Sequence, residues 1–178
     1  MTRIDDIATR LDEAAFSARA VAQIDPDGEL PLADAYEIQR RSVARRLARG
    51  ERPVGIKMGF TSRAKMIQMG VDDVIWGRLT SGMQVDDGGT LDLSRFIHPR
   101  VEPELAFVLK RPLSGHVSPA QALAAVEAVA PALEIIDSRY QDFKFSLSDV
   151  IADNASSSGF VVGPWADPRT DLANLGMV

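Results

Sequence analysis

Two glutamates stand two positions apart in the stretch RVEPELAFVL. Side chains alternate along a β-strand, so Glu102 and Glu104 would point side by side from one face. The opposite face, formed by Leu105, Phe107 and Leu109, is expected to pack in the core. Neighbouring carboxylates raise each other's pKa unless a cation neutralises them, and a hard divalent ion with oxygen ligands does this. The pair therefore indicates a metal site, with two solvent-facing acids as the alternative.

A third glutamate, Glu134, interrupts the apolar stretch PALEIID. Glutamate is rarely buried unless it is paired or bound to a metal, so Glu134 is a candidate third ligand. Asp137 falls on the opposite face of the same strand and is followed by Ser138 and Arg139. An ion pair between Asp137 and Arg139 at the strand end is the most economical account of these two charges.

Lys57 lies between Ile56 and Met58 in a β-like stretch with a glycine on either side, where little bulk would obstruct a ligand. A lysine in such a place can neutralise a substrate anion or relay a proton. An exposed lysine on an edge strand is the alternative.

A run of small polar residues, Asp153–Gly159, follows a predicted helical turn and precedes a predicted strand. Such loops can bind carboxylates through hydroxyl and backbone N–H groups, although most serine-rich loops are surface turns.

The composition restricts the class of protein. The 178 residues contain no cysteine and two histidines, so a metal here must rely on oxygen ligands, which favours magnesium, manganese or calcium. The net charge of −5 argues against nucleic acid. The arginine-rich segment 40–52 is interpreted as a solvated helix face. No signal peptide or membrane-spanning stretch is recognised, so we expect a cytoplasmic protein without membrane contact.

The elements that must position these side chains follow from periodicity. Apolar spacing predicts helices over residues 3–24 and 32–48, with a turn between them. Beyond Pro53, Ser62 is expected to cap a short helix that ends before Gly70, and SPAQALAAVEAVA is predicted to be helical with Ser118 as its cap. Predicted strands are VGIKMG, DVIWGRL, GTLDL, RVEPELAFVL, PALEIID and GFVVG. The sequence thus predicts an α+β fold, with a helical region over residues 1–52 and a mainly-β region over residues 53–178.

Five stretches occur in a specific order: GIKMGFTSRAKMIQMGVDD, WGRLTSGM, IHPRVEPELAFVL, ALEIIDSRY and VIADNASSSGFVVG. They cover most of residues 53–163. Together they resemble the fumarylacetoacetate hydrolase superfamily, in particular its branch of 2-oxopent-4-enoate hydratases and 4-oxalocrotonate decarboxylases. Phrases such as TSRAKMIQMG and GRLTSGM look more like the decarboxylases. The resemblance implies a mainly-β roll or barrel with an N-terminal helical region.

The resemblance also implies a site. A magnesium or manganese ion would be held by Glu102, Glu104 and Glu134, and Lys57 would be a catalytic or substrate-binding group. The polar loop would contribute further substrate-binding residues, namely Asn154 and one or more of Ser156, Ser157 and Ser158.

The activity implied is that of a carboxy-lyase. It would remove carbon dioxide from a small 2-oxo dicarboxylic acid, 4-oxalocrotonate, and give 2-hydroxypenta-2,4-dienoate in the meta-cleavage degradation of aromatic compounds. One alternative is the sister hydratase, and another is a non-catalytic partner of that hydratase. The partners expected are the hydratase, further copies of this chain, or both.

Members of this family normally continue well past the position where the present sequence stops. The stretch PWADPRTDLANLGMV neither closes a sheet nor caps a helix. We therefore expect a catalytic β domain that is truncated at its C-terminus.

Overall fold

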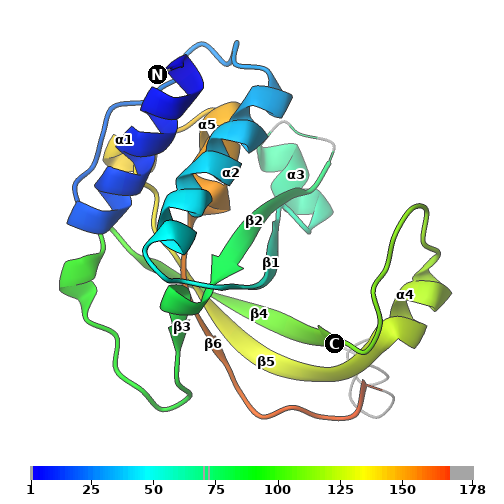
Figure 1. The fold of residues 1–178 in the computed structure, drawn as a ribbon. Helices are drawn as coiled ribbons and strands as arrows, with labels where there is room; N and C mark the ends of the chain where they lie inside the picture. Colours follow the sequence, from blue (N-terminus) through cyan, green and yellow to red (C-terminus); the bar gives the residue numbers. More distant parts are fainter. Residues whose placement is uncertain (1, 70, 72, 169–178) are drawn as a thin grey trace.

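Most of the helices gather at one end of the computed structural model (Figure 1), which describes residues 2–69, 71 and 73–168. Helices α1 (Arg3–Ser17), α2 (Leu32–Ala48) and α5 (Leu147–Ala152) gather at one end (Figure 1). The long strands β4 (Arg100–Leu109) and β5 (Val126–Ile136) extend from there toward α4 (Pro119–Ala125). This arrangement confirms the predicted α+β class.

The N-terminal helices begin where their sequences provide caps. Thr2 and Asp5 form a reciprocal capping box at the start of α1. Helix α1 ends at Ser17, earlier than predicted, because Ala18 adopts a left-handed conformation with φ 51° that turns the chain out of the helix. Helix α2 has the predicted bounds. A short helix, α3 (Arg63–Met69), follows the first strand, whereas Gly70, expected just beyond it, lies outside the described residues.

The strands form two sheets. Strands β1 (Pro53–Gly59) and β2 (Ile75–Thr80) form an antiparallel pair in which Lys57 faces Gly77. The larger sheet has the order β3-β6-β5-β4, where β3 is Gln84–Val85 and β6 is Ser157–Val162. In the antiparallel pairing of β4 with β5, Glu102 stands opposite Glu134 and Glu104 stands opposite Ala132. Both predicted acidic strands are therefore neighbours in one sheet.

In the described part of the chain, four single-turn 3-10 helices connect these elements: η1 (Ser81–Met83), η2 (Leu93–Arg95), η3 (Gln141–Phe143) and η4 (Asn154–Ser156). The prediction of a strand at GTLDL is wrong, because this stretch leads into η2. The carboxylate of Asp92 accepts a hydrogen bond of 2.9 Å from the backbone N–H of Ser94, which favours a turn over an extended strand.

The predicted helix at SPAQALAAVEAVA is correct in its first half only. Ser118 caps the helix as predicted, with Pro119 in the first turn, and Gln121 completes a capping box with Ser118. The chain becomes extended at Val126, which pairs with Leu109 of β4. Pairing with a distant strand overrides the local helix propensity of the alanine-rich segment.

The N-terminal helices share one core with the rest of the chain. Buried residues of α1 and α2 pack with residues of β2, α5 and the segments beside them; this cluster comprises Ala8, Leu11, Ala35, Ile38, Ile75, Tyr140, Val150, Ile151, Ala152 and Ala155. The division into regions 1–52 and 53–178 stays a proposal. None of the helices in the described part of the chain has the length and apolar character needed to span a bilayer.

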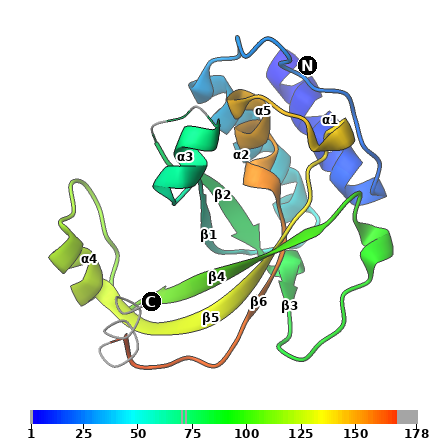
Figure 2. The same cartoon turned by 180° about the vertical axis from the view of Figure 1, so that it is seen from behind.

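The face of β4 predicted to lie in the core is exposed instead. Leu105, Phe107 and Leu109 keep 43%, 48% and 49% of their surface accessible in the described structure. Strand β4 is an edge strand of its sheet. Figure 2 shows that β4 and β5 run away from the helices α1, α2 and α5, so these helices do not cover the far part of the strands. An alternating pattern identifies the two faces of a strand but not whether anything covers each face.

Candidate metal and substrate site

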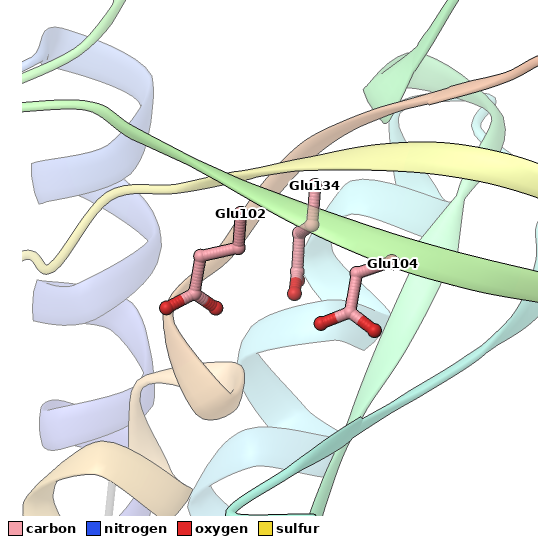
Figure 3. Close-up of side chains that lie close together, drawn as sticks. All are labelled: Glu102, Glu104 and Glu134. Carbon is pink, nitrogen blue, oxygen red and sulfur yellow. The ribbon is translucent and has the colours of Figure 1, made fainter. Parts of the chain in front are cut away.

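Three carboxylates converge on the face of the larger sheet that looks toward the helical end. Glu102 and Glu104 project from β4 and Glu134 from β5, all in the same direction (Figure 3). One oxygen of each can be chosen so that all three atoms lie within 4.8 Å of one another. Glu134 is buried, Glu102 is half-buried and Glu104 is exposed. The structure thus brings together the three acids that the sequence singled out.

Burial makes the carboxylate cluster electrostatically unfavourable without a cation. Burial raises the pKa of Glu134, more than the nearby Lys57 lowers it, and the charges of Glu104 and Glu102 raise it further. The carboxyl group of Glu104, although its residue is exposed overall, loses part of its hydration in the cluster, and this raises its pKa against the opposing effect of Lys57. The Oε1 atom of Glu134 is buried without a hydrogen-bond partner among the described residues. A buried acceptor of this kind calls for a ligand.

Lys57 reaches the cluster from the smaller sheet. Its Nζ atom lies 2.9 Å from Oε2 of Glu134, and its side chain is 12% exposed. The same Nζ donates a hydrogen bond of 3.2 Å to the backbone carbonyl of Ala155. The alternative of an exposed lysine on an edge strand is therefore wrong.

The donor set fits a hard divalent cation. The three side chains offer only carboxylate oxygens, which magnesium, manganese and calcium prefer. Lys57 offsets one of the three negative charges, and a divalent ion would offset the other two. The Oε1 atom of Glu134, which has no hydrogen-bond partner among the described residues, is free to act as a ligand atom. Glu102, Glu104 and Glu134 are therefore suited to hold such an ion.

A broad open cavity of about 1180 Å³ adjoins the carboxylates and Lys57. Beyond Glu104 and Glu134, its wall on the same sheet face is apolar, with Ala106, Ala132 and Phe160. The cavity can hold a small organic acid with a charged end at the carboxylates and the rest against the apolar wall.

The polar loop after α5 has a strained backbone. Asn154, Ala155 and Ser156 all adopt left-handed conformations, with φ of 54°, 51° and 59°. This conformation costs an L-residue roughly 1–2 kcal/mol, so three in succession persist only if their surroundings hold them. The Cβ that any other residue would carry at Gly77 would lie 2.5 Å from the carbonyl oxygen of Asn154, so the loop touches β2 directly.

The predicted loop residues differ in how free their side chains are. Asn154 accepts from the backbone N–H of Arg78 at 2.7 Å and donates to the Arg78 carbonyl at 2.9 Å. Ser158 accepts a hydrogen bond of 2.6 Å from Arg139. The hydroxyls of Ser156 and Ser157 are buried without a hydrogen-bond partner in the described part of the chain. These two serines therefore have the capacity to bind a further group.

The predicted pairing of Asp137 with Arg139 is wrong. Arg139 pairs with the buried Asp153, through Nε and Oδ1. Asp137 instead accepts hydrogen bonds from the backbone N–H groups of Ile97 at 2.9 Å and His98 at 2.8 Å, just before β4 begins. Arg139 and Asp137 are close in sequence, but Asp153 lies across a turn that the sequence did not reveal.

Two groups near the candidate site have little or no sequence signal. Ala155 acts through its backbone carbonyl, which every residue has. Asp153 stands at the start of a polar loop in the sequence, and its charge within the stretch VIADNA is the one sign that it is buried and paired.

A comparison with protein families identifies residues 59–178 as matching the C-terminal domain of fumarylacetoacetate hydrolase. A 4-oxalocrotonate decarboxylase of Pseudomonas sp is 64% identical over 99% of this chain and 69% of its own length. A 2-hydroxypent-2,4-dienoate hydratase of Pseudomonas putida is 41% identical over 99% of this chain and 82% of its own length.

The fold is similar to solved structures of one such enzyme. A 4-oxalocrotonate decarboxylase from Pseudomonas putida G7, complexed with magnesium and adipate, superposes with a TM-score of 0.90 at 41% identity, over 95% of this chain and 66% of that one. Its complex with calcium and acetate gives a TM-score of 0.88 at 39% identity. The present chain thus spans about two thirds of the length of the decarboxylases that it matches.

Proposed function

The chain belongs to the fumarylacetoacetate hydrolase family, and we propose on this basis that it is a metal-dependent carboxy-lyase that acts on 4-oxalocrotonate. The products would be carbon dioxide and 2-hydroxypenta-2,4-dienoate, within the meta-cleavage degradation of aromatic compounds. The higher identity to a decarboxylase, 64% against 41% to a hydratase, supports this choice within the family.

The observation that carries the proposal is the cluster of three carboxylates beside Lys57. Glu102, Glu104 and Glu134 would hold a magnesium or manganese ion, and the magnesium and calcium complexes of the decarboxylase from P. putida G7 support a divalent ion. A bound divalent ion supplies Lewis acidity that draws electron density toward the keto oxygen of a 2-oxo acid.

Lys57 is proposed to contact the substrate directly, through a hydrogen bond from Nζ. An ammonium group has three N–H donors, of which Glu134 and the carbonyl of Ala155 engage two. The third is available for a substrate oxygen. After carbon dioxide leaves, the proton at Nζ can neutralise the dienolate that remains, which gives the 2-hydroxydienoate product. Glu134 and Ala155 thus orient the proton, whereas Lys57 delivers it.

The apolar part of the cavity favours loss of carbon dioxide over retention of the carboxylate. Ala106, Ala132, Phe160 and Val162 line this part on the same sheet face as the acids. An apolar wall disfavours an ionised carboxylate but not neutral carbon dioxide. The distal carboxylate of the substrate is proposed to lie here, and the hydroxyls of Ser156 and Ser157 are proposed to bind the carboxylate next to the keto group.

The direct test is carbon dioxide release. Purified chain incubated with 4-oxalocrotonate and magnesium should release one carbon dioxide for each substrate consumed, and chelation of the metal should stop this release. Folded chain that binds magnesium yet releases no carbon dioxide from this substrate would overturn the assignment.

Glu104→Gln is the matched variant, because it keeps the size and removes the charge of one proposed ligand. We expect it to weaken magnesium binding by at least about tenfold, because losing even an outer-shell partner of a metal ligand weakens binding about 10–100-fold. We also expect it to abolish the metal-dependent turnover. Isothermal titration with magnesium measures the first effect. Unchanged affinity and activity would remove Glu104 from the site.

The sister hydratase is the second candidate, because a relative of that name is 41% identical to this chain. Hydration of 2-hydroxypenta-2,4-dienoate consumes the substrate without releasing carbon dioxide, so the same assay separates the two reactions. A chain that folds and associates with the hydratase but shows no response to magnesium or manganese would favour the non-catalytic alternative.

Association with the hydratase, self-association and a cytoplasmic location remain proposals drawn from the sequence. Co-purification of the chain with the hydratase, and sedimentation of the chain alone, test the first two.

A further inference from the structure

We propose that Arg139, which belongs to none of the groups assigned above, is a positioning residue that fixes the ammonium group of Lys57 through the backbone carbonyl of Ala155. The proposal rests on the assignment of Lys57 to the site under the proposed function, but not on which reaction the site catalyses.

Arg139 holds both ends of the segment Asp153–Ser158. At the first end, its backbone N–H donates to Oδ2 of Asp153 at 2.9 Å, and its guanidinium donates to Oδ1 and to the carbonyl oxygen of the same residue. At the other end, the guanidinium donates to the carbonyl of Ser157 at 3.3 Å and to the hydroxyl of Ser158 at 2.6 Å. Arg139 and Asp153 are 4% and 2% exposed, so water does not compete strongly with these contacts.

The segment between the two ends is strained, although the backbone N–H of Ser156 donates a hydrogen bond of 3.0 Å to the carbonyl of Asp153 within it. Its three left-handed residues, Asn154, Ala155 and Ser156, lie in a conformation that L-residues avoid. Two further contacts anchor it: the side chain of Asn154 binds the backbone of Arg78 in β2, and the carbonyl of Ser156 accepts a hydrogen bond of 2.9 Å from the backbone N–H of Asp137. Because the guanidinium of Arg139 binds both ends, it contributes to the distance between them, and Asn154 sets how closely the middle approaches β2.

The middle of this segment is where Lys57 is held. The carbonyl of Ala155 accepts from Nζ at 3.2 Å, and Oε2 of Glu134 lies 2.9 Å from the same nitrogen. A backbone carbonyl moves only when its segment moves. A change at Arg139 should therefore displace Lys57, although the two side chains have no contact with each other among the described interactions.

Arg139→Lys tests this link, because it keeps the positive charge and loses the fork that reaches both ends. Arg49→Lys is the matched control: Arg49 makes a two-pronged pair with the buried Asp12, at 2.7 Å for both contacts, between α1 and α2. Both variants should lower the melting temperature. A purely structural role of Arg139 predicts that the two variants behave alike in every other measurement.

The distinguishing readout is the ¹³Cε NMR signal of Lys57. The lysines of the chain are Lys57, Lys65, Lys110 and Lys144, and Lys57→Arg identifies the signal by its loss. We expect Arg139→Lys to shift the Lys57 signal and Arg49→Lys to leave it in place. We also expect kcat/KM to fall on the order of 100-fold in Arg139→Lys only, since small misplacement of a reacting group has effects of this size.

Ala155→Gly provides a second test that does not depend on folding of the buried arginine variant. Glycine adopts positive φ without strain, so this variant should fold, but its carbonyl should be held less firmly. The Lys57 signal should shift or broaden, and activity should fall. An unmoved Lys57 signal in folded Arg139→Lys or in Ala155→Gly would overturn the proposal. Because the signal needs no substrate, an absent decarboxylase activity would overturn only the proposed function.

Discussion

Glu134 combines features that a carboxylate rarely has together. It is 4% exposed, one of its oxygens has no hydrogen-bond partner in the described structure, and it stands opposite Glu102 across two paired strands. Only Lys57 at 2.9 Å compensates it among the ion pairs of the described residues. Such a group costs folding free energy when it is ionised and alone, and that cost makes it a strong ligand when a cation is present.

The stability of the metal-free chain should therefore depend on pH through Glu134. Burial raises the pKa of this group above its ordinary value of 4.5. A raised pKa in the folded state means that the stability contribution is fully present below about pH 4.5 and is lost as the pH rises through the folded pKa. In the presence of a chelator, we expect Glu134→Gln to melt higher than the unmodified chain at pH 7.5, and the difference to shrink toward pH 5.

Magnesium serves as the internal control for this pH series. Saturating magnesium should raise the melting temperature of the unmodified chain at pH 7.5 and should have little effect on Glu134→Gln. A melting difference that is the same at pH 5 and pH 7.5 would contradict the role given to Glu134.

At the scale of single residues, the sequence allowed candidate side chains to be identified but not the backbone groups that contact them. Glu102, Glu104 and Glu134 could be identified because a charge within an apolar strand needs a reason. Lys57 could be identified because glycines flank it. The carbonyl of Ala155 could not, and the partner of Arg139 was misassigned, because two aspartates were available and only the turn at residues 154–156 decides between them.

At the scale of elements, the helices α1 and α2 are joined by ion pairs. The carboxylate of Asp12, 4% exposed, accepts from Arg49 at 2.7 Å and from Arg45 at 2.9 Å. The arginine-rich segment is therefore more than a solvated helix face, because part of it binds the neighbouring helix. Burial raises the pKa of Asp12, but the hydrogen bonds from Arg49 and Arg45 outweigh it and lower the pKa overall.

Asp12→Asn should weaken this helix pair without affecting the metal site. Removing one partner of a buried pair costs several kcal/mol, which we reduce to about 2 kcal/mol because both arginines are partly exposed. For a chain of this size, that corresponds to a fall in melting temperature of roughly 4–8 °C. Thermal unfolding measures this fall, and a calorimetric titration should give unchanged magnesium affinity. A loss of magnesium affinity would show that the helices and the site are coupled.

Some elements follow from local sequence and others do not. The bounds of α2 follow from the sequence because its apolar spacing and the Gly50 that comes soon after it are local signals. The start of β5 at Val126 was not, because its pairing with Leu109 is a contact between distant parts of the chain. Boundaries set by such pairing cannot be read from a propensity pattern.

At the scale of the whole molecule, the larger sheet presents an apolar face to solvent. Val101, Leu105, Phe107 and Leu133 are between 43% and 61% exposed in the described structure. A contiguous apolar surface of this kind binds apolar dyes and promotes association. We expect the chain to enhance the fluorescence of 8-anilinonaphthalene-1-sulfonate, and Phe107→Lys to reduce this enhancement.

Phe16→Lys is the control for this measurement. Phe16 is 80% exposed on α1, where its ring lies under the guanidinium of Arg49 at 5.6 Å, and it does not belong to the exposed apolar face of β4 and β5. Its replacement should leave the dye fluorescence nearly unchanged. Equal reductions in the two variants would mean that the dye reports scattered apolar residues rather than this face.

The alignment of β4 against β5 has a consequence for how the chain reaches its working form. Glu102 faces Glu134 in one register only, and a slip of a single residue would turn the acids of one strand to the other face of the sheet. A β4–β5 pairing shifted by one residue could not direct all three carboxylates toward the same ion. A cation that binds the correct alignment and no other lowers the free energy of that alignment by mass action. The ion would then select the correct pairing of β4 with β5 during folding, in addition to its role as a cofactor.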